Sequence, residues 1–125
     1  RLVNTDLDRA IGLFHVACAS GNGLGCNDLG VLYTDEARLV RDPVRAASYF
    51  ELGCSLESAD ACNNLGVLNE RGLGTTQDLD RAHGAYDAGC ELGLALACSN
   101  AAALRARDTL QQGRKHSAQF ESPTG

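Results

Sequence analysis

The sequence feature that most constrains the fold is a pair of cysteines separated by seven residues, which occurs three times. Each pair lies 36 residues after the previous one, and no cysteine of this 125-residue chain falls outside the pattern. The pairs are Cys18 and Cys26, Cys54 and Cys62, and Cys90 and Cys98. A period of about 20 to 50 residues is typical of a solenoid, in which each unit buries its apolar face on its neighbours.

The repeated units align without a gap as residues 6–41, 42–77 and 78–113. Each copy begins with the pattern Asp-x-x-Arg-Ala and carries an aromatic residue four positions after the alanine. At this length we expect one repeat domain, covering residues 1–113. Residues 1–5 are interpreted as the end of a preceding repeat or a leader, and residues 114–125 as a capping helix or a loose tail.

Each copy is predicted to form two helices joined by a short turn. Asp42 is a favourable N-cap, and Pro43 occupies the first helical position, where its missing N–H costs nothing. In the first copy Ala10, Phe14 and Ala17 are spaced as one helical face, and leucines three residues apart mark a second helix after the second cysteine. The predicted fold class is therefore all-α, with three antiparallel helix pairs.

Three chemistries compete to explain the cysteine pairs: a disulfide in each copy, a metal site or a reactive thiol. Six thiols allow about 15 complete pairings, but the repeat makes pairing within each copy the simplest arrangement. The two cysteines of a copy should face each other across the turn, where a disulfide needs Cα atoms roughly 4.4–6.8 Å apart. Zinc sites typically have about two to four residues between paired cysteines, and no Cys-x-x-Cys redox motif is present. The sequence therefore predicts three structural disulfides and an oxidising compartment.

Charge and motif content argue against several functions. The formal net charge is -5 and the pI is about 5.0, so affinity for nucleic acid or anionic membranes is not expected. No apolar run approaches the roughly 20 residues needed to span a bilayer. A nucleophile elbow and a Ser-x-x-Lys motif are both absent, and His15, His83 and His116 occupy different positions of the repeat. No catalytic residue, metal site or cofactor is predicted.

Other residues of the repeat resemble a known family. They are the pattern Asp-x-x-Arg-Ala-x-x-x-Phe/Tyr, the Cys-x7-Cys spacing, and the run Asn-Leu-Gly-Val-Leu at 64–68 followed by Gly-Leu-Gly at 72–74. Together they resemble the Sel-one-like repeat, a relative of the tetratricopeptide repeat. The resemblance extends from Asp6 to about Arg107 and implies a right-handed α-solenoid of antiparallel helix pairs.

A disulfide in every copy is similar to the cysteine-rich branch of this family. That branch includes secreted bacterial proteins, some described as penicillin-binding or β-lactamase-like, and a mitochondrial intermembrane-space assembly factor for cytochrome oxidase. The resemblance implies a non-catalytic protein–protein interaction scaffold, or an accessory subunit or assembly factor of a larger complex. It places the protein in the mitochondrial intermembrane space, in the bacterial periplasm or outside the cell. The alternative is a secreted protein that binds or hydrolyses β-lactams.

Positions that vary between copies on a constant scaffold are candidates for partner contact. In tetratricopeptide-like solenoids the first helices line the concave surface, and this resemblance places two variable columns there, together with Tyr49. The candidate partner-binding residues are Ile11, His15, Ala47, Tyr49, Glu51, His83 and Asp87. The alternative is that these side chains only face solvent. The expected partner is a protein, without nucleic-acid binding or membrane insertion.

Overall fold

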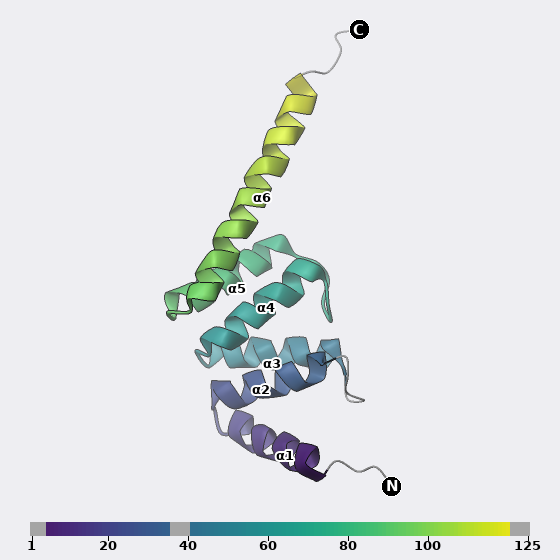
Figure 1. The fold of residues 1–125 in the computed structure, drawn as a ribbon, viewed down its shortest axis with the longest axis vertical. Helices are drawn as coiled ribbons and strands as arrows, with labels where there is room; N and C mark the ends of the chain where they lie inside the picture. The colour runs from purple at the N-terminus through teal and green to yellow at the C-terminus, as the bar shows by residue number, and fades with distance from the viewer. Residues whose placement is uncertain (1–4, 36–40, 121–125) are drawn as a thin grey trace.

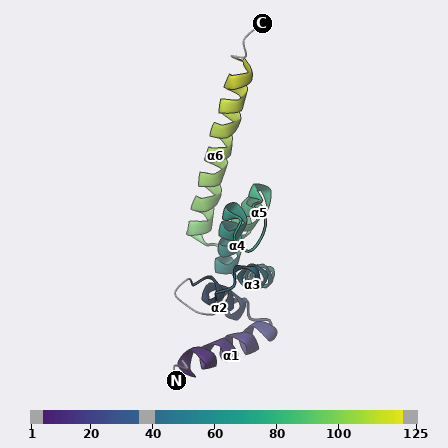
Figure 2. The same ribbon diagram turned by 90° about the vertical axis from the view of Figure 1, so that its right-hand side faces the viewer.

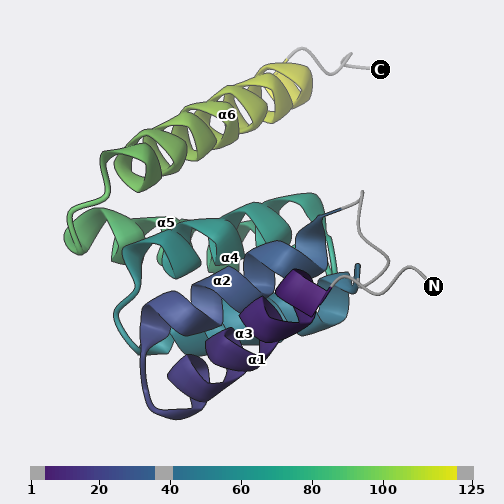
Figure 3. The ribbon, with the colours of Figure 1, turned by 60° about the horizontal axis from the view of Figure 1, so that its bottom comes forward.

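The chain folds into α-helices stacked in chain order (Figure 1). The computed structural model describes residues 5–35 and 41–120, with the side chains of 6–35 and 41–113. The helices are α1 (Thr5–Ala19), α2 (Gly23–Thr34), α3 (Pro43–Ser55), α4 (Ala59–Arg71), α5 (Leu79–Glu91) and α6 (Ala95–Phe120). No strand occurs in the described ranges, and consecutive helices pack against each other (Figure 3). The prediction of an all-α solenoid of helix pairs is confirmed.

Helix ends follow local residue types. The side chains of Asp42 and Asp78 accept hydrogen bonds from the backbone N–H groups of Arg45 and Arg81, at 3.2 and 3.0 Å. Both aspartates are therefore N-caps, and they start the first helix of the second and third copies. Gly72 ends α4 at φ 69°, a left-handed conformation that favours a residue without a Cβ atom.

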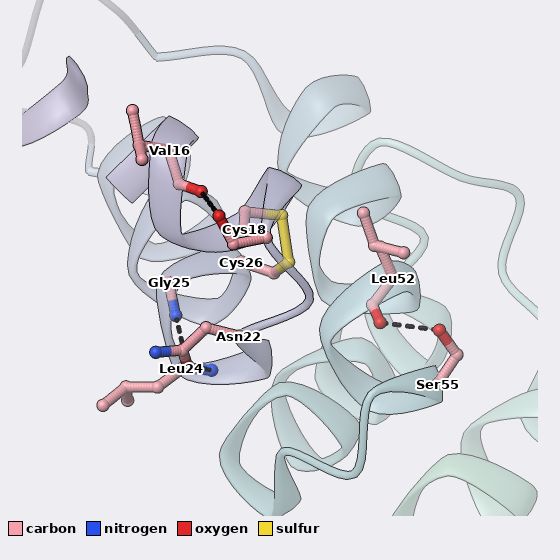
Figure 4. Close-up of a disulfide and its surroundings, with 9 residues drawn as sticks. Val16, Cys18, Asn22, Leu24, Gly25, Cys26, Leu52 and Ser55 are labelled. Atoms are coloured by element: carbon pink, nitrogen blue, oxygen red, sulfur yellow. Dashed lines mark hydrogen bonds between the residues drawn. A yellow bond between two sulfur atoms is a disulfide. The ribbon is translucent and has the colours of Figure 1, made fainter. Parts of the chain in front are cut away.

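A disulfide joins the end of the first helix to the start of the second helix in each copy, and Figure 4 shows the first of them. The paired Cα atoms lie 4.5 to 4.6 Å apart, within the range that a disulfide requires. The pairs are Cys18 with Cys26, Cys54 with Cys62, and Cys90 with Cys98, as predicted. Because each sulfur is bonded to another sulfur, none of these cysteines offers a thiolate to a metal or a substrate.

Neighbouring copies are joined through α2 packed on α3 and α4 packed on α5, the most extensive helix contacts in the structure. At both interfaces an aromatic ring lies against a glycine of the preceding helix. Phe50 covers Gly30 and Tyr86 covers Gly66, and a Cβ atom on either glycine would overlap the ring. Both rings are 2% exposed. Each mid-helix glycine costs about 1 kcal/mol of helix propensity, and it makes room for the aromatic residue of the next copy.

Buried asparagine pairs connect the second helices of adjacent copies. The side-chain amide of Asn64 donates to Oδ1 of Asn27 at 2.9 Å, and that of Asn100 donates to Oδ1 of Asn63 at 2.8 Å. Asn27 and Asn63 are both buried. A buried polar group without a partner costs about 1–3 kcal/mol. These hydrogen bonds therefore favour one register between adjacent copies.

The two helices of each copy meet at a pair of small residues, of which one is glycine and the other alanine. The pairs are Ala17 with Gly25, Gly53 with Ala61, and Gly89 with Ala97. A Cβ atom on the glycine would lie 2.6, 2.8 and 2.9 Å from the alanine Cβ in the three copies, in that order. The meeting point therefore has room for one methyl group. The first copy carries that methyl on the first helix, and the other two carry it on the second.

We expect Gly53→Ala to destabilise the protein and Ala61→Gly to recover part of the loss when the two are combined. The single change gains about 1 kcal/mol of helix propensity. It also forces two methyl groups together, and such overpacking costs about 1–3 kcal/mol. Since Ala61→Gly removes one of these methyls, the double variant should show a favourable coupling of about 0.5–3 kcal/mol in unfolding free energy.

The measurement is urea unfolding of the wild type, both single variants and the double variant. Gly12→Ala is the matched control, because Gly12 is exposed and no atom lies within 4 Å of the added Cβ. This change should leave the unfolding free energy unchanged or raise it. Strictly additive effects of Gly53→Ala and Ala61→Gly would show that the meeting point accommodates both methyl groups.

Helix α6 is longer than the others and continues beyond the stack (Figure 2). The region predicted as a capping helix or a loose tail begins with residues 114–120, which continue α6, and residues 121–125 lie outside the described residues. Arg105 of α6 pairs with Asp87 of α5, and Arg107 pairs with Glu70 of α4. These ion pairs connect α6 to both preceding helices.

Candidate protein-interaction surface

The predicted partner-binding residues fall into three groups along α1, α3 and α5, and each group has different surroundings. We call the whole set the first-helix surface. It consists of Ile11, His15, Ala47, Tyr49, Glu51, His83 and Asp87.

The group nearest the N-terminus is an aromatic cluster. The ring of Tyr49 stacks on Tyr33 of α2, with centroids 5.7 Å apart and planes inclined by 9°. His15 meets the Tyr49 ring edge-on, with a centroid distance of 5.7 Å and an angle of 77°. Nη1 of Arg45 donates a hydrogen bond to the Tyr33 hydroxyl at 3.4 Å. Ile11 packs partly into the core, so His15 and Tyr49 are the members of this group that the structure brings together.

The middle group borders a hollow of about 310 Å³ between α3 and α5. Glu51 is exposed at its edge, whereas Ala47 is 9% exposed and contributes mainly to its shape. Asn69 of α4 and Arg81 of α5 line the same hollow. Within the described side chains, neither the Glu51 carboxylate nor the Arg81 guanidinium forms an ion pair. The hollow therefore presents one negative and one positive group whose charges no described ion pair satisfies.

The group nearest the C-terminus contacts α6. Nε2 of His83 lies 2.9 Å from Oδ2 of Asp108, and Asp87 forms the ion pair with Arg105. The polar atoms of His83 and Asp87 are thus partnered within the chain. Both residues belong to the first-helix surface, but their side chains bind residues of α6 and stabilise its packing.

Sequence reasoning from the first helices alone misses the second-helix column at this surface. Its members are Tyr33, Asn69 and Arg105, and they contact or adjoin the aromatic cluster, the hollow and Asp87. The three residues occupy the same repeat position and are chemically unrelated. That variation is the same signal that identifies the first-helix columns, so the sequence contained the information needed to find them.

A group of polar contacts lies away from the first-helix surface, where α4, α5 and α6 meet. The Tyr86 hydroxyl donates to Oε1 of Glu70 at 2.7 Å, while Oε2 of the same carboxylate pairs with Arg107. Burial, followed by the hydrogen bond to Glu70 and its negative charge, holds the pKa of Tyr86 well above its ordinary value. One carboxylate therefore connects three helices.

The fold and its disulfides define an α-solenoid built from disulfide-linked helix pairs. More specifically, the chain belongs to the Sel1 repeat family, whose model matches residues 2–22, 23–58 and 59–94. The last two matched segments are each 36 residues long, the same period as that of the cysteine pairs. They begin at a second helix, whereas the copies 6–41, 42–77 and 78–113 begin at a first helix. We retain these three copies and the 1–113 domain as our proposed division of the chain.

Solved structures with the same fold include a cysteine-rich protein of Helicobacter pylori, cysteine rich protein B. It is 29% identical, with a TM-score of 0.68, and the match covers 71% of this chain and 67% of that one. A protective antigen of uropathogenic Escherichia coli displaying an SLR fold is 21% identical, with a TM-score of 0.71, and the match covers 78% of this chain and 21% of that one. A Sel1 repeat protein from Oxalobacter formigenes is 24% identical, with a TM-score of 0.64 and coverage of 69% and 25%.

The two longer structures show similarity of fold alone, because the chain spans about a fifth and a quarter of their lengths at low identity. A search of curated proteins found no match. In the part of the chain that the structure describes, no helix combines the length and the apolar character needed to cross a membrane.

Proposed function

We propose that this protein is a non-catalytic scaffold that binds a protein partner through the first-helix surface. The observation that carries the proposal is the hollow between α3 and α5, where Glu51 and Arg81 present opposite charges without ion pairs among the described residues. Because every copy carries a disulfide, the solenoid holds these groups in place before binding. Preorganisation reduces the entropy that association costs.

We also propose the compartment in which the protein binds its partner. Three disulfides are characteristic of an oxidising environment. We propose the mitochondrial intermembrane space, the bacterial periplasm or the cell exterior, with the protein acting as an accessory subunit or assembly factor of a larger complex. Co-purification with a respiratory complex favours the first setting, and a cleaved secretory signal in the precursor favours the others.

The test exchanges the two charges of the hollow. Glu51→Arg combined with Arg81→Glu keeps the net charge but inverts the local field, so a partner complementary to the native arrangement meets like charges. We expect its capture to fall about tenfold or more. The measurement is affinity purification of the tagged protein from its source cells, followed by quantitative mass spectrometry.

The matched control combines Arg9→Glu with Glu91→Arg, which exchanges two exposed charges outside the hollow. It should capture the partner as the wild type does. Equal capture by the Glu51/Arg81 exchange would contradict the proposed surface. Steady hydrolysis of a chromogenic β-lactam, abolished by that exchange, would replace the scaffold with the β-lactamase-like alternative.

A further inference from the structure

We propose that a second surface, the groove between α2 and α4, binds an acidic side chain of a partner protein next to an apolar residue. This inference rests on the proposed function only in taking a protein as the partner. The surface is different from the first-helix surface, and so are the residues that test it.

The α2–α4 groove has an apolar floor and a cationic wall. It is a hollow of about 370 Å³ whose lining includes Val31, Thr34, Phe50, Val67, Arg71 and Leu73. Val31 is 47% exposed and Leu73 is 37% exposed, so apolar surface is open to solvent here. Arg71 is exposed and forms no ion pair within the described side chains. The groove therefore pairs apolar contact area with an unneutralised guanidinium.

The repeat supplies its own comparison in the hollow between α4 and α6, one copy further along. Glu70, Leu104 and Arg107 line that hollow, where the Glu70 carboxylate pairs with the Arg107 guanidinium. Thirty-seven residues separate Glu70 from Arg107, and the same spacing separates Thr34 from Arg71. The α2–α4 groove thus keeps the arginine and replaces the glutamate with a threonine.

The equivalent pair identifies the chemistry that the α2–α4 groove lacks. A carboxylate placed as the Glu70 side chain is placed would meet Arg71, as Glu70 meets Arg107. Arginine binds carboxylates with paired, charge-assisted hydrogen bonds, so it selects this group over a neutral amide. Phe50 stands where Tyr86 stands in the next copy and offers no hydroxyl to a polar ligand. An acidic residue adjoining an apolar one is therefore the complementary partner segment.

Arg71 also lines the hollow between α4 and α6, because it lies on the wall between the two. Two carboxylates line that second hollow, and both already have partners. Glu70 pairs with Arg107 and accepts the Tyr86 hydrogen bond, and Asp108 pairs with His83. No carboxylate occurs among the described residues that line the α2–α4 groove, so no acidic group there competes for Arg71.

The experiment uses two fluorescein-labelled peptides with blocked ends, one alternating Leu and Glu and the other alternating Leu and Gln. Fluorescence anisotropy measures their binding to the full chain. The net charge of -5 repels an acidic peptide in general, so preference for the Glu peptide reports a local cationic site. We expect the Glu peptide to bind about tenfold or more tightly than the Gln peptide.

Two variants locate the binding. Arg71→Gln removes the guanidinium, and Thr34→Glu supplies the missing carboxylate within the chain and should occupy Arg71 as Glu70 occupies Arg107. Both should weaken binding of the Glu peptide about tenfold, while the charge-matched control Arg9→Gln should change it less than about twofold. Thermal unfolding of each variant separates lost binding from lost folding.

Equal binding of the two peptides, binding of neither, or an equal loss with Arg9→Gln would each overturn the inference. The Glu51/Arg81 exchange leaves the α2–α4 groove intact. Failure of the first-helix surface and failure of this groove are therefore distinguishable.

Discussion

Reduction of all three disulfides is expected to unfold the protein. Each bridge closes a short loop between residues eight positions apart. The chain-entropy relation gives about 2–3 kcal/mol for a loop of this size. Three such losses amount to about 6–9 kcal/mol, while a native domain is stable by only about 5–15 kcal/mol. The measurement is far-ultraviolet circular dichroism during heating, with and without a thiol-free reductant.

Removing a single bridge provides the matched control for reduction. Cys54→Ser with Cys62→Ser should lower the unfolding free energy by about 2–3 kcal/mol, because the other two copies keep their bridges. We expect the helical signal to be lost when all three disulfides are reduced. We expect the variant that lacks one bridge to remain folded. A reduced protein that unfolds cooperatively at the wild-type temperature would show that helix packing alone holds the copies together.

Phe50→Ala should cost about 3–5 kcal/mol, the range for deleting a buried aromatic side chain. The ring is 2% exposed and fills the space above Gly30, so its removal leaves a cavity at the interface between the first two copies. The neighbouring backbone cannot collapse into that space without moving α2 relative to α3. Guanidinium unfolding of the wild type and the variant measures the change.

Phe14 offers a control within the same chain, because it occupies the same repeat position in α1. Within the described residues it lies against no preceding second helix, and it is half-buried. Phe14→Ala should therefore cost clearly less than Phe50→Ala. Equal costs would mean that the ring position, rather than the interface with the preceding copy, determines its contribution.

Much of the fold could be predicted from the sequence because the same residue pattern occurs in all three copies. The cysteine pairs recur at one period, so pairing within each copy was the simplest arrangement, and the structure confirms it for Cys54 and Cys62. Aspartate caps and the aromatic position recur in the same way. A pattern present in every copy cannot arise from one accidental contact, and it therefore predicted the helix pairs, their disulfides and their order.

The candidate site was less predictable because its contacts join different repeat positions. The first-helix columns were identifiable from their variation, but variation does not reveal which residues are partnered. His83 and Asp87 are bound by residues of α6, whereas Glu51 borders an open hollow without an ion pair among the described residues. Ala47 is buried at the hollow, which its residue type alone does not indicate.

The sequence by itself determined the all-α class, the 36-residue unit and the disulfide in each copy, since these depend on the spacing of residues within one copy. The tertiary structure alone decided how one copy meets the next. The Asn64 to Asn27 hydrogen bond and the packing of the Phe50 ring on Gly30 depend on the register between helices of adjacent copies. Period and composition do not specify that register. It is set by side chains from two copies that pack against each other. The pairing of Glu70 with Arg107, which Arg71 lacks among the described side chains, is likewise seen only in the structure.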